Sequence, residues 1–160
     1  MSFFTDDTYF SGPTVTTELV EAAEQSLGVK LPPSYLALLR ERNGGVPHGC
    51  CFPMSIPTSW ARDHIEVRAI RGIGGEWGID ATSGLGSADM IREWGYPNVG
   101  LVLCHTPSGG HDTVMLDYKS ETQDGEPCVV YVDEDRRPQR IAASFQDFID
   151  QLYVCGSYRA

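Results

Sequence analysis

Side chains able to act as bases, nucleophiles or metal ligands lie close together in the middle of the sequence. His105, Ser108, His111 and Asp112 fall within or beside the segment Thr106-Pro-Ser-Gly-Gly110. Two imidazoles and a carboxylate are ligand types that bind zinc and other divalent ions. A serine near a histidine and an aspartate is the set used in hydrolytic triads. One hypothesis is therefore a metal-dependent hydrolase built on His105, His111 and Asp112.

The spacing of these residues argues against both kinds of active site. The interval between His105 and His111 is not a recognised metal signature, and a further ligand, Asp117, is as easily placed in solvent. Ser108 lacks the surroundings of a nucleophile elbow. Adjacent side chains on a strand point to opposite faces, so neither Cys104 and His105 nor His111 and Asp112 can act together as a nucleophile and its base or as a base and its orienting group. The favoured expectation is a protein without catalytic residues, metal ligands or a cofactor.

The residues on either side of this polar segment predict a β-hairpin. Leu101-Val-Leu103 is a short apolar run typical of a central strand. Val114, Leu116 and Tyr118 alternate with other residues, as in a strand with one buried face. Pro107 and the glycines that follow supply the backbone angles of a tight connection. The polar side chains should therefore stand at the tip of two paired strands.

Large aromatic side chains are the other candidates for function. Tryptophan and tyrosine are enriched at the energetic centres of protein interfaces. They also drive the packing of protein cores, so a fully structural role remains the alternative. Together with the polar residues of the predicted turn, the candidate partner-binding residues are Trp60, Trp77, Trp94, Tyr96, His105, Ser108, His111 and Asp112.

The charge balance restricts the possible partners. The chain has 12 basic and 22 acidic side chains, giving a formal net charge of −10. No basic face is visible, which argues against direct binding of nucleic acid. An acidic surface attracts basic partners and speeds their encounter, although acidity also serves solubility alone. We expect a basic protein partner, with no role at a membrane.

The cysteines and the N-terminus bear on the cellular compartment. There are five cysteines, without C-x-x-C spacing, and adjacent Cys50 and Cys51 form a poor disulfide and a weak metal pair. The first residues lack the features of a signal peptide, and no apolar run approaches the roughly 18 residues of a membrane span. We expect a reduced, cytoplasmic protein in which cysteines serve mainly as small buried hydrophobic residues.

The rest of the chain predicts helices at both ends and strands in the middle. This order is typical of an α+β fold, and a length of 160 residues suits a single domain. Strands are expected at 64–71 and 128–132 and near 50–52. Helices are expected after the caps Thr16, Ser87 and Ser144, and from Pro33.

The glycine-rich segment 72–78 resembles a phosphate-binding loop only superficially. It fits neither G-x-G-x-x-G nor a Walker loop, because Trp77 replaces a required glycine and no lysine follows. The more economical interpretation is a turn after a strand that carries Trp77 into the core.

Three groups of segments resemble the SUKH superfamily, the Smi-Knr type of domain. The pattern Leu-Gly-x-x-Leu-Pro-x-x-Tyr followed by Asn-Gly-Gly is fairly specific, and the closing Ser-Phe-x-x-Phe adds to it. The matching segments are 27–35, 43–45, 70–74, 97–103, 108–118 and 143–149. The resemblance covers about residues 14–155, which leaves an N-terminal arm at 1–13 and a C-terminal tail at 156–160.

The resemblance implies a fold and a class of function. The fold is a single α+β domain with an N-terminal helix pair, a central, mostly antiparallel sheet and a C-terminal helix. Bacterial members are largely viewed as immunity proteins that neutralise secreted toxins, often nucleases. Fungal relatives are tied to regulation of cell-wall glucan synthesis. The family has no shared catalytic site, so the resemblance implies a non-catalytic, protein-binding module.

Overall fold

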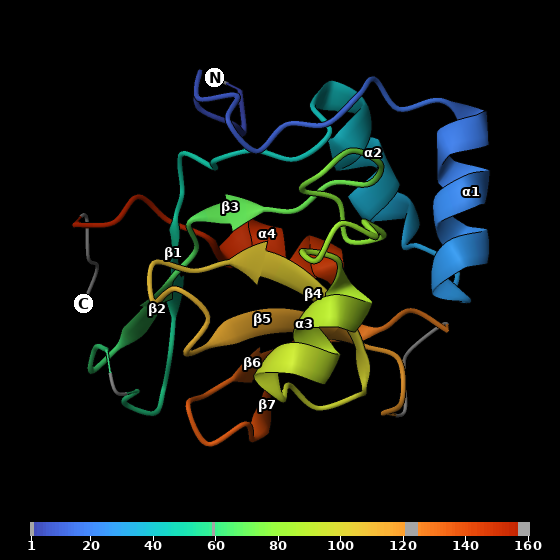
Figure 1. Ribbon diagram of the computed structural model, residues 1–160. Coiled ribbons are helices and arrows are strands. Elements are labelled where there is room, and N and C mark those ends of the chain that lie inside the picture. Colours follow the sequence, from blue (N-terminus) through green and yellow to red (C-terminus); the bar gives the residue numbers. More distant parts are fainter. Residues whose placement is uncertain (1, 59, 121–124, 157–160) are drawn as a thin grey trace.

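A five-stranded antiparallel sheet forms the centre of the computed structural model (Figure 1). The structure describes residues 2–58, 60–120 and 125–156, so the expected C-terminal tail lies almost wholly outside the described residues. The sheet order is β3-β4-β5-β6-β7, and β1 and β2 form a separate two-stranded sheet. The elements are α1 (Thr17–Leu27), α2 (Pro33–Glu41), β1 (Cys51–Pro53), β2 (His64–Glu66), β3 (Ala69–Ile70), α3 (Ser87–Trp94), β4 (Gly100–His105), β5 (Thr113–Asp117), β6 (Cys128–Val132), β7 (Pro138–Ala142) and α4 (Phe145–Gln151). The α+β fold is confirmed.

Local sequence signals account for the helix ends. The Thr16 side chain accepts a hydrogen bond from the amide of Leu19 at the start of α1, and Ser144 does the same for Asp147 in α4. Gly28 ends α1 with a left-handed φ of 73°. The expected cap of α3 was wrong by one residue, because Gly86 holds that position. Ser87 is instead buried, and its hydroxyl accepts a hydrogen bond of 2.8 Å from the amide of Val102 in β4.

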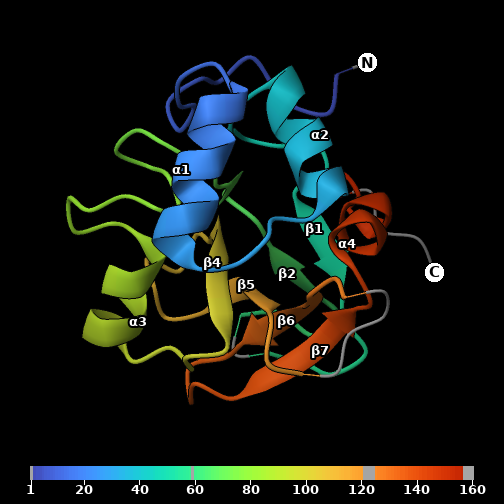
Figure 2. The same ribbon diagram turned by 90° about the vertical axis from the view of Figure 1, so that its right-hand side faces the viewer.

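The sheet is covered on both faces, which explains why β4, β5 and β6 are almost entirely apolar. Alternate residues of these strands face two separate clusters, one with α1, α2 and α4 and one with α3. Leu101 and Leu116 belong to the larger cluster, while Val102 and Met115 pack with Met90 of α3. Figure 2 shows α3 and α4 on opposite sides of the central strands. The predicted hairpin is confirmed: β4 and β5 pair antiparallel, with Leu101 opposite Leu116.

The strand expected over residues 64–71 was wrong in its extent. It is divided into β2, which pairs with β1, and β3, which pairs with β4 in the main sheet. The alternation of apolar residues continues through the division, since Ile65, Val67 and Ala69 are all buried. Alternation of apolar residues therefore predicts which side chains are buried, but it does not predict which strand pairs with which. The edge strand β7 was not predicted as a strand, and its burial is mostly partial or absent.

The N-terminal arm packs on the body of the protein. Phe4 is 2% exposed and forms an isolated β-bridge with Pro47. Asn43, which follows α2, links the arm to the chain after β3: its Nδ2 donates to the carbonyl oxygens of Pro13 and Ile73, each at 2.7 Å. Its Oδ1 accepts from the amide of Ile73 at 2.9 Å. A single buried amide side chain therefore connects three segments distant in the sequence.

A buried arginine connects the main sheet to the loop before α3. Arg71 is 0% exposed, and its guanidinium donates to the carbonyl oxygens of Val102 at 3.2 Å, Gly78 at 3.1 Å, and Leu85. The hydroxyl of Tyr35 donates to the backbone carbonyl oxygen of Arg71 at 2.5 Å. Burial lowers the pKa of Arg71 to about 10, so the side chain remains charged at neutral pH. The planar fork of arginine suits such a site, because it reaches several acceptors at once.

The expectation that the cysteines are reduced, buried hydrophobic residues was wrong for part of the set. Cys51 and Cys155 form a disulfide across a sequence separation of 104 residues. Cys104 and Cys128 are free and buried as expected, whereas Cys50 is free and only partly buried. Among the described residues, no helix is long and apolar enough to cross a bilayer.

Candidate partner-binding surface

The aromatic and polar candidates gather around the β4–β5 turn, residues 106–112. The ring of Trp60, in the loop between β1 and β2, lies 6.0 Å from the ring of His111. The ring of Trp77, in the loop before α3, lies 5.6 Å from that of His105 at the end of β4. We call the eight predicted residues together the turn surface: Trp60, Trp77, Trp94, Tyr96, His105, Ser108, His111 and Asp112.

A buried carboxylate fixes the shape of the turn. Asp112 is 5% exposed, and its Oδ1 accepts hydrogen bonds from the hydroxyls of Thr106 at 2.7 Å and Ser108 at 2.6 Å. Its Oδ2 accepts from the hydroxyl of Tyr131 in β6 at 2.5 Å. Ser108 also accepts from the amide of Asp112 at 3.1 Å. Ser108 therefore bonds the carboxylate directly, with no imidazole between them, which is not the arrangement of a triad.

His105 is held in an aromatic cluster away from the polar network. Its ring lies 5.0 Å from that of Phe10 in the N-terminal arm. Burial, together with the positive charges of Arg71 and Arg68, lowers the pKa of His105 to about 3. Its Nε2 is buried without a hydrogen-bond partner among the described residues. The imidazole is consequently neutral and serves as a packing group in this structure.

The residues of the metal hypothesis do not converge. Asp117 pairs with Gly100, at the end of the hairpin opposite the turn, and its Oδ1 accepts from the amides of Lys119 at 2.8 Å and Ser120 at 3.0 Å. Among the described residues, the ligand groups close enough to share an ion lie elsewhere, around Cys51. His105, His111 and Asp112 are not among these groups.

Arg136, which the sequence analysis missed, fastens one side of the turn surface. Its guanidinium lies 4.6 Å from the centre of the Tyr96 ring and donates to the carbonyl oxygens of Trp94 at 3.0 Å and His111 at 2.8 Å. The Trp94 ring packs so closely on Gly110 that a Cβ there would lie 2.8 Å from it. A local sequence pattern could not reveal these contacts, because Arg136 belongs to the β6–β7 connection.

The four aromatic candidates differ in exposure. Trp60 is 51% exposed and Trp94 is 40% exposed, whereas Tyr96 is 4% exposed and part of the core under α3. Trp77 is half-buried, so the expectation that it enters the core was wrong. It packs against Tyr9 of the arm, 5.4 Å between ring centres, and Tyr9 is itself 65% exposed. Exposed aromatic surface thus lies on several sides of one turn.

A hollow beside Trp60 gives the turn surface a concave region. It has a volume of about 230 Å³ and lies between the β1–β2 hairpin and the turn. Trp60, Ile65 and Pro107 contribute apolar lining, and Glu66 contributes a carboxylate. A concave apolar site with a few polar groups is the usual form of a site that receives a side chain or small ligand.

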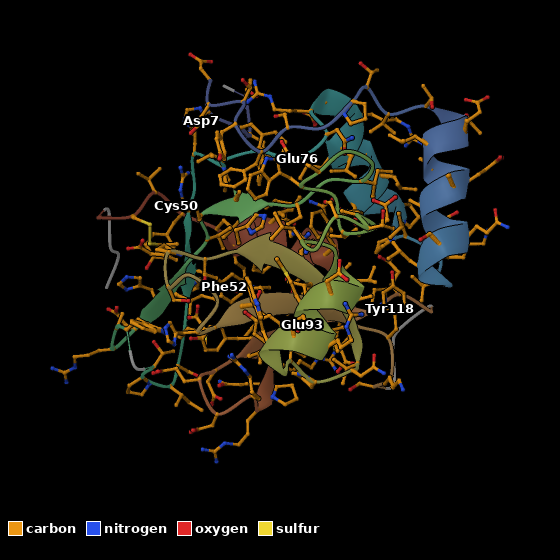
Figure 3. All side chains as sticks on the ribbon, in the orientation of Figure 1. Asp7, Cys50, Phe52, Glu76, Glu93 and Tyr118 are labelled. Atoms are coloured by element: carbon orange, nitrogen blue, oxygen red, sulfur yellow. A yellow bond between two sulfur atoms is a disulfide. The ribbon has the colours of Figure 1, made fainter. Side chains whose placement is uncertain are left out.

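Acidic side chains accompany the aromatic residues of the surface. Glu76 and Glu93 are exposed and directly precede Trp77 and Trp94, and Figure 3 labels both side chains, Glu93 on α3. Nearby basic side chains are partly neutralised, since Arg92 lies 2.8 Å from Asp89 and Arg68 lies 3.8 Å from Asp7. Arg92 also lies 3.3 Å from Glu93, so Glu66 and Glu76 are the border carboxylates without such an ion pair among the described residues. The surface therefore combines apolar anchors with an acidic border.

Replacing Asp112 with alanine should loosen the turn. The hydroxyls of Ser108 and Tyr131 would lose the carboxylate as acceptor, whereas Thr106 keeps the backbone carbonyl at position 112, 3.1 Å away. Leaving buried polar groups unpaired costs about 1–3 kcal/mol. We expect urea denaturation of Asp112→Ala to show a loss of unfolding free energy in that range. The control Asp150→Ala removes an exposed carboxylate of α4 and should change stability by less than about 0.5 kcal/mol. A loss equally small for Asp112→Ala would contradict the assigned role of the carboxylate.

His105 should make stability depend on pH in one direction. Its pKa is about 3 in the folded protein against an ordinary value of 6.5, so between these values the unfolded chain binds the extra proton. The protonation of His105 in the unfolded chain therefore costs no stability above pH 6.5, and it lowers the free energy of unfolding increasingly as the pH decreases toward 3. His105→Phe keeps the aromatic packing without the proton, and its stability relative to the wild type should improve as the pH falls from about 7 to 4.5. A stability difference that is constant over this range, measured by urea denaturation, would show that His105 is not the titrating group.

Comparison with known proteins identifies the family. No curated protein matches the chain. The profile of the SMI1 / KNR4 family (SUKH-1) matches residues 14–151, which include every helix and strand of the described residues and the whole turn surface. The match agrees with the motif resemblance, with Tyr35 of the Leu-Pro-x-x-Tyr segment buried beneath Arg71. This chain belongs to the SMI1 / KNR4 family (SUKH-1).

Proposed function

We propose that the protein is an immunity protein that neutralises a toxin by stoichiometric binding through the turn surface. The observation that carries the proposal is the exposure of Trp60 and Trp94 on the two sides of one rigidly held turn. Exposed tryptophans beside a concave region are typical of the residues that dominate binding energy. Membership in a family associated with protein–protein interaction supports the same conclusion.

The partner that fits this surface is a basic protein domain, such as a nuclease toxin. A nuclease must itself be positively charged to hold nucleic acid. The chain has a net charge of −10, and Glu66, Glu76 and Glu93 border the aromatic residues. Complementary charge increases the rate of association and excludes partners of the wrong sign.

A binding role accounts for the turn residues better than a catalytic one. Both carboxylate oxygens of Asp112 accept hydrogen bonds, and the imidazole of His105 is neutral and surrounded by rings. A general base must reach the proton that it removes, and these groups are directed into the turn and the core. We propose accordingly that the protein is not an enzyme. A location in the cytoplasm is a separate proposal, which comes from the sequence features alone.

The identity of the partner can be tested by capture followed by rescue. The tagged chain is used to isolate bound proteins from cells that express it naturally, and each captured protein is then produced in a host with and without the chain. We expect a basic protein whose production stops growth, and growth should return when the chain is produced with it. Capture of a harmless envelope-synthesis or signalling protein instead would overturn the immunity function in favour of a regulatory scaffold.

The two exposed tryptophans should dominate this binding. Trp60→Ala and Trp94→Ala should each weaken the affinity for the captured toxin by about thirtyfold, which corresponds to a hot-spot contribution of about 2 kcal/mol. Gln25→Ala, in the exposed part of α1, serves as the control and should leave the affinity unchanged. Calorimetric titration with folded variants gives the affinities. If both tryptophan variants bind as well as the control, the partner uses another surface.

The acidic border should make association dependent on salt. Raising the ionic strength from about 0.1 M to 1 M shortens the screening length from about 10 Å to about 3 Å, so the association rate should fall. Glu66→Gln with Glu76→Gln should reduce both the rate and its salt dependence. The pair Glu18→Gln with Glu21→Gln removes equal charge from α1 and should have a smaller effect. Equal effects of the two pairs in stopped-flow measurements would mean that only the net charge matters.

A further inference from the structure

Three cysteine sulfurs meet at one end of the β1–β2 sheet. Cys51 and Cys155 form the disulfide, and the Sγ of Cys50 lies 2.7 Å from the Sγ of Cys155. The three Sγ atoms all lie within 4.8 Å of one another. A disulfide uses only two sulfurs, so it does not account for the third. Figure 3 shows Cys50 beside β1.

The backbone brings these sulfurs together independently of the disulfide. Cys51 and Tyr153 exchange two backbone hydrogen bonds, of 3.0 Å from the amide of Cys51 and 2.9 Å from the amide of Tyr153. Gly49 lies directly against this segment, since a Cβ there would stand 3.2 Å from the carbonyl of Leu152. The segment that carries Cys155 is therefore held against β1 by main-chain pairing, and it would stay there with the cysteines reduced.

A histidine on the paired strand lies beside one of these sulfurs but is not grouped with all three, so its ring would have to turn toward the other two to complete a ligand set. His64 is opposite Pro53 in the register of β1 and β2, and one of its ring nitrogens lies within 4.8 Å of the Cys51 Sγ. Its Nδ1 lies 2.8 Å from Oδ1 of Asp63. A carboxylate on one imidazole nitrogen orients the ring and leaves the other nitrogen free, as in most histidine ligands of metals.

We propose that the reduced protein binds one Zn²⁺ through the thiolates of Cys50, Cys51 and Cys155 and the imidazole of His64. Three cysteines and one histidine are a standard ligand set of structural zinc sites. With zinc–sulfur bonds of about 2.3 Å, the ligand atoms of a tetrahedral site lie about 3.8 Å apart. The three Sγ atoms lie within 4.8 Å of one another, so small side-chain movements in the reduced protein would give this spacing. Cys50, Cys155 and His64 are all partly exposed, which gives the ion a path from solvent.

The chemical steps need one co-reactant, a thiol or dithiol reductant. A dithiol supplies two electrons and two protons to the Cys51–Cys155 disulfide and becomes a disulfide itself, which leaves three thiols at the site. Zn²⁺ then displaces one proton from each thiol, so three protons are released to solvent while His64 binds as the neutral ring. The site exists only in the reduced protein, and oxidation to the disulfide would expel the ion.

Spectroscopy with cobalt tests the ligand set directly. The full chain is reduced with a phosphine, freed of metal and titrated with Co²⁺, which reports tetrahedral thiolate ligation by its visible and near-ultraviolet absorption. We expect saturation at one equivalent and complete displacement by Zn²⁺. Cys50→Ser and His64→Gln should each lower the affinity by about tenfold or more. Cys128→Ser, outside the cluster, should leave the spectrum and affinity unchanged.

Alkylation provides an independent measurement. Zinc should protect Cys50, Cys51 and Cys155 from iodoacetamide in the reduced protein, as read by peptide mass spectrometry. Absence of the cobalt–thiolate absorption, or an affinity and spectrum of Cys50→Ser that are unchanged from the wild type, would overturn the proposal. Reduced protein that takes up no Co²⁺, together with oxidised protein that contains a mixture of Cys51–Cys155 and Cys50–Cys155 disulfides, would overturn it as well and would assign the third sulfur to disulfide exchange. None of these results depends on the partner of the turn surface.

Discussion

The buried carboxylate of Asp112 determines how the β4–β5 turn can present its neighbours. It receives hydroxyl groups from Thr106 and Ser108 within the turn and from Tyr131 of β6, two strands away from β4. Because Asp112 and Tyr131 are buried and Thr106 and Ser108 are half-buried, unmade bonds in this network would be costly, and the turn has little freedom to rearrange. A pre-shaped turn lowers the ordering cost of binding, so the same residues that resemble a catalytic set serve to make a rigid recognition element.

The remainder of the fold supplies the supports for this turn. Arg71 ties the loop that carries Trp77 to β4, through the carbonyl oxygens of Gly78 and Val102, and its charge helps keep His105 neutral. Arg136 ties the end of α3 to the opposite side of the turn. Both arginines bond carbonyl groups of distant segments rather than acidic side chains. The anchors of the surface are therefore positioned by the packed core and not by mobile ion pairs.

Sequence reasoning succeeded where the determining contacts are local and failed where they are not. Thr16 and Gly28 mark the ends of α1 through contacts with adjacent residues, and the apolar run of β4 with the following turn is itself a local signal of the hairpin. The division of residues 64–71 between two sheets depends on which strands are available as partners, which alternation does not encode. The two cysteines of the disulfide, Cys51 and Cys155, are 104 residues apart. The sequence shows that Cys50 and Cys51 are adjacent, but it does not show that the fold brings Cys155 to them. The aromatic candidates could be chosen by type, but their assembly around one turn required the fold.

Hydrogen–deuterium exchange of the chain, alone and bound to its captured toxin, tests the central claim most directly. If the turn surface is the binding face, complex formation should slow exchange in residues 60–66, 93–96 and 106–112 while the exposed face of α1 is unchanged. Protection confined to α1 and α2, with the turn exchanging as in the free protein, would contradict the account.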